Sequence, residues 1–207
     1  MKLKNKRRVI IGLAGLGLLL LYFIRTYSSL VFLFVTVGVL FLFHYIDNIY
    51  NFEFPLKYYI YLFLIIVTGA ILGPGEPFVF YYRWLLFDKF LHLFSPILLS
   101  AIIFYILDRL DITLKWKFLL TVSVVMSILA LFEIGEFLGD YFFNYELQGV
   151  YLYDFIQRTK YEKFLEPHLD TMLDLIFGFA GCIVYVIYKW THLGIKSLFF
   201  NKPLKVK

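Results

Sequence analysis

Six long apolar segments constrain the fold of this chain more than any other feature of its sequence. They are residues 9–24, 30–46, 58–72, 90–107, 118–138 and 169–190. A helix that crosses a bilayer needs roughly 17–25 apolar residues, and the last three segments reach this length by themselves. The first three reach it with flanking tyrosines and lysines, whose side chains extend to the membrane–water interface. The pattern therefore predicts a polytopic helical membrane protein.

The composition supports this class and excludes others. Hydrophobic residues make up 61% of the 207 residues and charged residues 17%, against roughly 45–50% and 25% in soluble domains. The mean hydropathy is +0.79. A soluble enzyme, a disordered tail and a disulfide scaffold are excluded, the last because Cys182 is the one cysteine. We predict an all-α fold, a single domain over residues 1–207 that forms a bundle of six transmembrane helices.

The distribution of positive charge predicts the orientation. If the N-terminus is cytoplasmic, 14 of the 20 lysines and arginines lie inside and six lie outside, as the positive-inside rule requires. Both termini are then cytoplasmic, in a multi-pass protein of the cell membrane. Topology, not nucleic-acid binding, thus explains the net charge of +5. The basic N-terminus and the segment 9–24 also resemble a signal peptide, but no small-residue cleavage site follows, so we interpret this segment as a retained span.

Two predicted external segments, 73–87 and 141–167, are long and rich in aromatic residues. Unstructured loops of this length are uncommon. We expect both segments to lie in the interface, with rings at headgroup level. Whether they form an ordinary aromatic belt or a lid over a site stays open at this point.

Three pairs of ionisable residues lie inside or at the edge of the last three spans. They are Asp88 and His92, Glu133 and Glu136, and Asp170 and Asp174. Spacings of three or four place both members of each pair on one helix face. In the predicted orientation, all three pairs lie at the external helix ends. Ionisable groups are costly in a membrane and indicate a functional site there.

The chemistry of these side chains favours a divalent metal. Asp88 and Asp170 lie where carboxylates can cap helix N-termini, but Glu133 and Glu136 lie near a helix C-terminus, which disfavours anions. Carboxylates brought together repel one another and need a cation or a shared proton. We expect a site for Mg, Mn, Zn or Fe, and its predicted ligands are Asp88, His92, Glu136, Asp170 and Asp174. Glu133 is a further ligand or a general base, and His92 a further catalytic candidate.

Two other interpretations of the same residues stay open. Lys89 and Arg83 could balance the carboxylates in a structural ion network. Protonated carboxyls could instead belong to a proton or cation pathway. His44 and Asp47, near the cytoplasmic end of the second span, are interpreted as an interfacial pair. Gly135 and Gly139 form a GxxxG motif beside the glutamates, a spacing that favours close helix approach.

The motifs resemble those of known membrane proteins. Asp-Lys-x-x-His at 88–92, Glu-x-x-Glu-aromatic at 133–137 and Asp-Thr-x-x-Asp followed by a glycine-rich helix at 170–181 resemble the YjdF-type family of bacterial and archaeal inner-membrane proteins. More distantly, the same order resembles VanZ-like proteins, which are associated with glycopeptide resistance and cell-envelope phenotypes. The resemblance covers roughly residues 69–181 and implies the fold and the importance of the six positions. It does not imply a reaction.

Three functions are compatible with these observations. We favour a divalent-metal-dependent membrane enzyme that acts on a lipid or lipid-linked envelope substrate at the external face, with membrane lipids as its partners. A cation- or proton-coupled transporter is the second candidate, although the lower halves of the last three spans carry few polar residues. A non-catalytic assembly protein, whose polar residues only fix helix packing, is the third.

Overall fold

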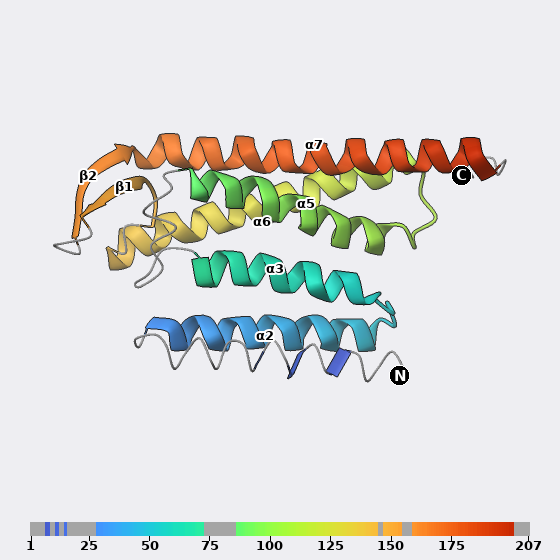
Figure 1. The fold of residues 1–207 in the computed structure, drawn as a ribbon, viewed down its shortest axis with the longest axis horizontal. Coiled ribbons are helices and arrows are strands. Elements are labelled where there is room, and N and C mark those ends of the chain that lie inside the picture. Colours follow the sequence, from blue (N-terminus) through green and yellow to red (C-terminus); the bar gives the residue numbers. More distant parts are fainter. Residues whose placement is uncertain are drawn as a thin grey trace. The chain divides into compact units, whose positions relative to one another are not determined.

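The structure is a computed structural model that describes residues 7–8, 11–12, 15, 28–72, 86–144, 147–154 and 159–200. The chain forms two compact units, Met1–Tyr81 and Tyr82–Lys207. Both are helical, and the second also contains a two-stranded sheet (Figure 1). Most of the first predicted span and most of segment 73–87, with Arg83, lie outside the described residues. The single-domain organisation stays a prediction.

In the first unit, two helices correspond to the second and third predicted spans. They are α2 (Ser28–Ile49) and α3 (Leu56–Leu72), and they pack against each other. The connection between them is short and turns at Asn51 and Glu53, which adopt positive φ angles. Two aromatic residues that follow this turn, Phe54 and Tyr59, are fully buried. A short connection makes neighbouring helices antiparallel, as consecutive spans must be.

Asp47 organises this end of the first unit. Its carboxylate forms an ion pair with Arg7 at 2.7 Å and accepts hydrogen bonds from the Tyr59 hydroxyl and, at 3.2 Å, from the Phe54 amide. Arg7 also donates to the Phe54 carbonyl. His44 contacts Tyr59 and Asn48 instead of Asp47. Asp47 and His44 therefore belong to a network around a buried carboxylate, and their position at the membrane interface stays a prediction.

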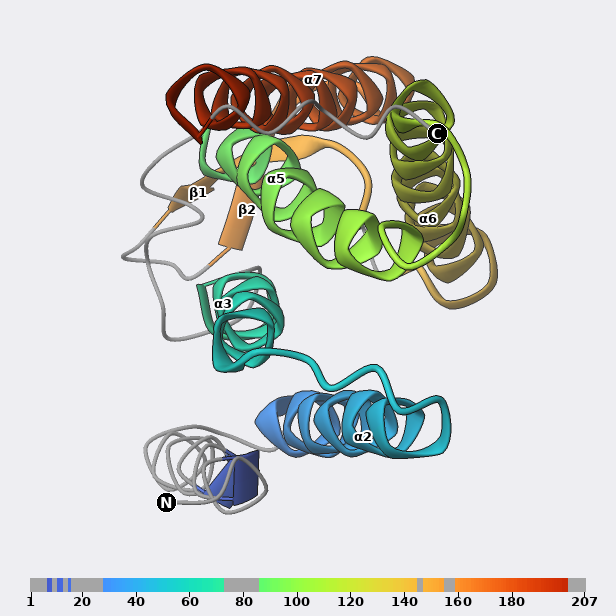
Figure 2. The same ribbon diagram turned by 90° about the vertical axis from the view of Figure 1, so that its right-hand side faces the viewer.

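The second unit contains three long helices, α5 (Phe87–Leu107), α6 (Leu114–Phe143) and α7 (Pro167–Phe200). Each packs against the other two (Figure 2). Among the described residues, three helices are long and apolar enough to cross a membrane, Phe87–Leu107, Leu114–Phe143 and Pro167–Gly194. Two shorter apolar helices, Val37–Ile49 and Leu56–Ile66, belong to the first unit. A helical membrane protein is confirmed; six spans and cytoplasmic termini stay predictions.

Glycines allow α7 to approach its neighbours closely. A Cβ atom at Gly181 would clash with the Leu93 carbonyl oxygen and press on Pro96 of α5, and one at Gly178 would clash with Leu129 of α6. A Cβ at Gly135 would meet nothing within 4 Å. Within the part of the chain that the structure describes, Gly135 therefore mediates no close helix approach, contrary to the expectation; for Gly139 the close approach stays a prediction. The face of α6 that carries Gly135 is not the face that packs on α5 and α7.

Two apolar clusters fill the centre of the three-helix unit. One is formed by Phe104, Phe118 and Tyr185, and the other by Val125, Leu129 and Cys182. The first cluster draws residues from all three helices. The second joins α6 and α7, and Leu99 and Ile103 of α5 pack against it. The main contribution to packing is thus apolar contact, while one end of the unit is polar.

A β-hairpin lies between α6 and α7, in the segment 141–167 that was expected to lie in the interface. Its strands, β1 (Val150–Asp154) and β2 (Thr159–Leu165), pair antiparallel, with Val150 opposite Leu165. α6 ends before it at Asn144, whose left-handed conformation stops the helix. α7 starts after it at Pro167, because proline is well suited to the first turn of a helix. The hairpin therefore projects from the end of the unit where α5 and α7 begin.

Candidate metal centre

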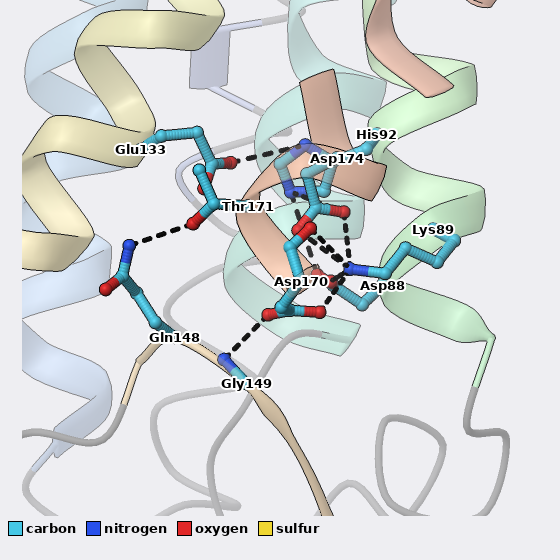
Figure 3. A network of polar contacts seen from close by, with 9 residues as sticks. All are labelled: Asp88, Lys89, His92, Glu133, Gln148, Gly149, Asp170, Thr171 and Asp174. Atoms are coloured by element: carbon cyan, nitrogen blue, oxygen red, sulfur yellow. Dashed lines mark hydrogen bonds and ion pairs between the residues drawn. The ribbon is translucent and has the colours of Figure 1, made fainter. Parts of the chain in front are cut away.

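The three predicted pairs lie at the hairpin end of the second unit. Asp88 and His92 come from the start of α5, Asp170 and Asp174 from the start of α7, and Glu133 from the second half of α6 (Figure 3). The opposite direction of α6 explains why its glutamates come late in the helix. The helical spacing thus predicted which ends would meet.

The Lys89 ammonium is the positive centre of this group. It contacts both carboxylate oxygens of Asp174 at 2.7 Å and Asp88 Oδ2 at 2.9 Å, and it forms an ion pair with Asp170 Oδ1. Lys89 is only 2% exposed and Asp174 2%. The counter-ion that the sequence offered as an alternative to a metal is therefore present.

His92 lies between carboxylates from all three helices. Its Nε2 atom is 3.7 Å from Asp88 Oδ1 and 3.8 Å from Asp174 Oδ1, and its Nδ1 atom is 3.7 Å from Glu133 Oε1. These separations are too long for hydrogen bonds. The imidazole is buried, and the surrounding carboxylates lie near it without forming hydrogen bonds to it.

Glu133 is a buried carboxylate without a hydrogen bond. It is 4% exposed, and neither of its oxygens has a hydrogen-bond partner among the residues that the structure describes. The Thr171 hydroxyl lies beside it (Figure 3) but does not form a hydrogen bond of normal geometry. Such a group is costly unless a ligand or a proton satisfies it. Its carboxylate is directed at the imidazole of His92 (Figure 3).

Asp170 joins the centre to the hairpin. Its Oδ2 atom accepts a hydrogen bond of 2.7 Å from the Gly149 amide, while its Oδ1 atom pairs with Lys89. Gln148 donates to the Thr171 hydroxyl at 2.9 Å. Gly149 has a φ of 93°, where a side chain would be strained. Both oxygens of Asp170 are therefore occupied.

Asp140 fixes the same loop from the other side. Its carboxylate accepts hydrogen bonds from the backbone amides of Leu147 at 2.5 Å and Gln148 at 2.9 Å. Sequence reasoning missed Gln148 and Gly149 as neighbours of the site. Their signal was weak, because a single glycine after an aromatic stretch has many other uses.

Not all predicted ligands converge. Asp88, His92 and Asp174 each offer one ligand atom, and these three atoms lie within 4.8 Å of one another. Asp170 is adjacent but fully bonded. Glu136 lies one turn beyond Glu133, half-buried, and forms no hydrogen bond or ion pair within the described part of the chain. Metal ligation by Glu136 and Asp170 stays a prediction.

Among the described residues, carboxylates outnumber basic groups at the centre. Four carboxylates, those of Asp88, Glu133, Asp170 and Asp174, surround one lysine and one imidazole. A buried group of this kind can accept a further cation, provided that the carboxylates can reach it. Asp88, His92 and Asp174 offer such a position, because their ligand atoms lie within 4.8 Å of one another.

These features define a helical membrane protein with a buried acidic and histidine centre at one end of three apolar helices. The chain belongs to the family described as predicted membrane protein (DUF2238), whose model matches residues 7–194. This is the YjdF-type family that the motifs resemble, so that prediction is confirmed. No curated protein and no solved structure matches the chain. The VanZ-like resemblance stays a prediction.

Proposed function

We propose that this protein is a divalent-metal-dependent enzyme that acts on the headgroup of a lipid or lipid-linked envelope substrate at the external face of the cell membrane. One observation carries the proposal. The ligand atoms of Asp88, His92 and Asp174 converge within 4.8 Å, beside a buried Glu133 that no hydrogen bond satisfies. Burial of a carboxylate without a hydrogen bond is costly, and this cost is consistent with a site that a bound metal or substrate completes.

The donor set suits a particular group of metals. Two carboxylates and one imidazole fit Mg, Mn, Fe or Zn better than a soft metal. Three protein ligands leave positions for water and substrate, as catalytic sites require. A metal held there would act as a Lewis acid toward a phosphoryl or carbonyl oxygen of the substrate.

Glu133 is the candidate general base. It lies on the far side of His92 from the Asp88–Asp174 pair, within the same buried space (Figure 3). In a hydrolysis, its carboxylate would take the proton from the attacking water and return it to the leaving oxygen. His92, which lies between carboxylates, would hold the metal in a fixed position.

The surroundings of the centre suit a lipid substrate. Apolar side chains near it are exposed on the outside of the helices, among them Phe132 on α6 and Met172 on α7. The end of α6 presents three further exposed rings, Tyr141, Phe142 and Phe143. Aromatic rings concentrate at the headgroup level of membranes. A headgroup could therefore reach the centre from the side, with its chains remaining in the bilayer.

A transporter is less well supported. Below the centre, the Phe104 and Val125 clusters fill the described part of the three-helix unit with apolar side chains. The buried Thr121 hydroxyl is bonded to the Lys117 carbonyl of its own helix. A cation that left the centre toward the cytoplasm would have to cross this apolar layer.

A non-catalytic role is favoured by one specific observation. Asp170 uses both oxygens to join α5, α7 and the hairpin loop, which is what an assembly network requires. This candidate predicts that Asp174→Asn and Glu133→Gln are tolerated, and that no metal binds.

Turnover in defined vesicles tests the proposal. The purified protein would be placed in vesicles of phosphatidylethanolamine, phosphatidylglycerol and a polyprenyl diphosphate, with Mg, Mn, Zn or Fe added singly. We expect headgroup release from one of these lipids that a chelator abolishes and that Asp174→Asn and Glu133→Gln also abolish. Glu166→Gln, an exposed change on the hairpin side, is the matched control. Turnover that survives Asp174→Asn, or none with any metal, would contradict the enzyme assignment.

A further inference from the structure

Lys89 occupies the place where a metal would bind. Its Nζ atom is 2.7 Å from Asp174 Oδ1 and 2.9 Å from Asp88 Oδ2, and these two carboxylates belong to the converging ligand group with His92. We propose that Lys89 is an internal counter-ion that a divalent cation displaces from Asp174, after which Asp170 retains the ammonium. The inference rests on the proposed function and concerns how that site is controlled.

An ammonium and a metal ion cannot share these oxygens. Both are cations, and metal–oxygen distances of roughly 2.0–2.2 Å leave no room for a hydrogen-bonded N–H on the same lone pairs. Repulsion between the two cations would therefore drive the ammonium from Asp174, both of whose oxygens it contacts. It would also weaken the contact of the ammonium with Asp88 Oδ2, since Asp88 Oδ1 faces His92. Metal binding thus includes the cost of breaking buried ion pairs, which is large when a charge is left without a partner.

Asp170 removes most of that cost. It lies outside the converging group, and Gly149 fixes its carboxylate from the opposite oxygen. Lys89 already contacts both its Oδ1 atom and, at 3.5 Å, its backbone carbonyl. The four-carbon stem of lysine is flexible, so a small rotation keeps the ammonium on Asp170 while it leaves Asp174. The displaced lysine is then still paired and buried.

An independent feature indicates that the centre accepts a ligand besides Lys89. The Glu133 carboxylate is buried, has no hydrogen bond among the described residues and is directed at His92. Lys89 does not contact it. The ammonium therefore stabilises only the Asp side of the centre. A cation bound to His92 Nε2 would leave the ring proton on Nδ1, which faces Glu133 and would give that carboxylate a partner.

As a consequence, the Lys89 ammonium occupies the metal-binding carboxylates when the concentration of divalent metal is low. Without metal, Lys89 neutralises part of the cluster and keeps α5 and α7 together. Removal of the lysine charge has two opposite effects. The metal-free protein becomes less stable, and the affinity for a divalent cation increases because the competing cation is gone.

Manganese binding to Lys89→Met tests the inference. Titration calorimetry of the full chain in detergent would measure the affinity for Mn²⁺, and thermal unfolding would be recorded with chelator and with Mn²⁺. We expect Lys89→Met to bind Mn²⁺ at least ~10-fold more tightly than wild type, since a competing ion pair has been removed. Its unfolding midpoint should be lower than wild type with chelator and should rise more on addition of Mn²⁺.

Two further variants make the result specific. Lys117→Met removes a lysine that pairs with Asp108 at the other end of the same unit, and it should bind Mn²⁺ like wild type. Lys89→Gln removes the charge but keeps an N–H donor for Asp170, so it tests the inference if Lys89→Met does not fold. It should also bind more tightly than wild type.

The outcomes separate this inference from the proposed function. If wild type binds Mn²⁺ and Asp174→Asn does not, but neither Lys89 variant binds more tightly, the counter-ion role is overturned and the metal site stands. If Lys89→Met binds and wild type does not, Lys89 is a permanent counter-ion that no divalent cation displaces, and both the displacement and the metal dependence of the natural protein are overturned. If no variant binds Mn²⁺, both are overturned.

Discussion

At the scale of single residues, Glu133 shows what the centre costs the protein. A carboxylate that is 4% exposed and without a hydrogen bond in the described structure destabilises the fold. The other buried acids of the centre are compensated, Asp170 by Lys89 and Gly149 and Asp174 by Lys89. We propose that a bound ligand completes the site and gives the Glu133 carboxylate its partner.

Glu133→Gln should therefore separate stability from binding. The amide has the same shape without the charge, so we expect an equal or higher unfolding midpoint in chelator, from a relief of ~1–3 kcal/mol. The same change should weaken Mn²⁺ binding ~10-fold or more, as for partners that support a metal site. Thermal unfolding and calorimetry on one preparation measure both.

The exposed Glu166, which pairs with Lys163, supplies the control. Glu166→Gln should leave both quantities unchanged. A large fall in the unfolding midpoint of Glu133→Gln, with Mn²⁺ affinity retained, would instead make Glu133 a structural residue.

The residue scale also shows how far the sequence predicts the site. Helical periodicity was sufficient to place Asp88 beside His92 and to bring Asp174 to the same level, because spacings of four fix the face. It could not show that Lys89 lies at the centre, since a long flexible side chain can reach in several directions. Nor could it separate Glu133 from Glu136, because a small rotation of the helix decides which of them faces inward.

At the scale of elements, the glycines of α7 bring the centre together. Gly178 and Gly181 let α7 approach α5 and α6 just below the polar end. The sequence offered glycines on both α6 and α7, and only packing reveals which helix faces carry the contacts. The hairpin was missed altogether, because its aromatic residues suit an interfacial loop equally well.

Gly181→Ala should destabilise the three-helix unit. Its Cβ would clash with the Leu93 carbonyl oxygen, and backbone cannot move aside as a flexible side chain does. We expect a loss of ~1–3 kcal/mol, typical of overpacking, measured by denaturant or thermal unfolding in detergent.

Gly135→Ala is the matched change on α6, where a Cβ meets nothing within 4 Å. It should be neutral or stabilising by up to ~1 kcal/mol, because alanine is the better helix former. Equal losses from both substitutions would contradict the close approach at Gly181.

At the scale of the whole molecule, hydropathy predicted the class of helical membrane protein but underestimated the lengths of the helices α6 and α7. α6 and α7 have 30 and 34 residues, or about 45 and 51 Å at 1.5 Å per residue. Both exceed the roughly 30 Å hydrocarbon core. Their ends therefore continue outside the apolar segments 118–138 and 169–190, where hydropathy gives no signal.

The predicted orientation can be tested with single cysteines. Cys182 is buried and serves as the unlabelled parent. With an impermeant maleimide on intact cells, Glu162→Cys in β2 should be labelled, because the positive-inside rule places the hairpin outside. Asp111→Cys, in the exposed turn between α5 and α6, should be labelled only after permeabilisation.

The reverse labelling pattern would show that the protein has the opposite orientation in the membrane and that the centre lies at the cytoplasmic face. Labelling of both cysteines on intact cells would contradict α6 as a membrane span.

The central claim is that Asp88, His92 and Asp174 hold a divalent metal, and metal content tests it most directly. Elemental mass spectrometry would compare detergent-purified wild type with Asp88→Ala and Asp174→Asn, after identical washing and loading with Mg, Mn, Zn or Fe. Lys117→Met would serve as the control. We predict close to one metal per chain in wild type and control, and a loss in both centre variants. Background metal in wild type, or equal metal in all four proteins, would contradict the account.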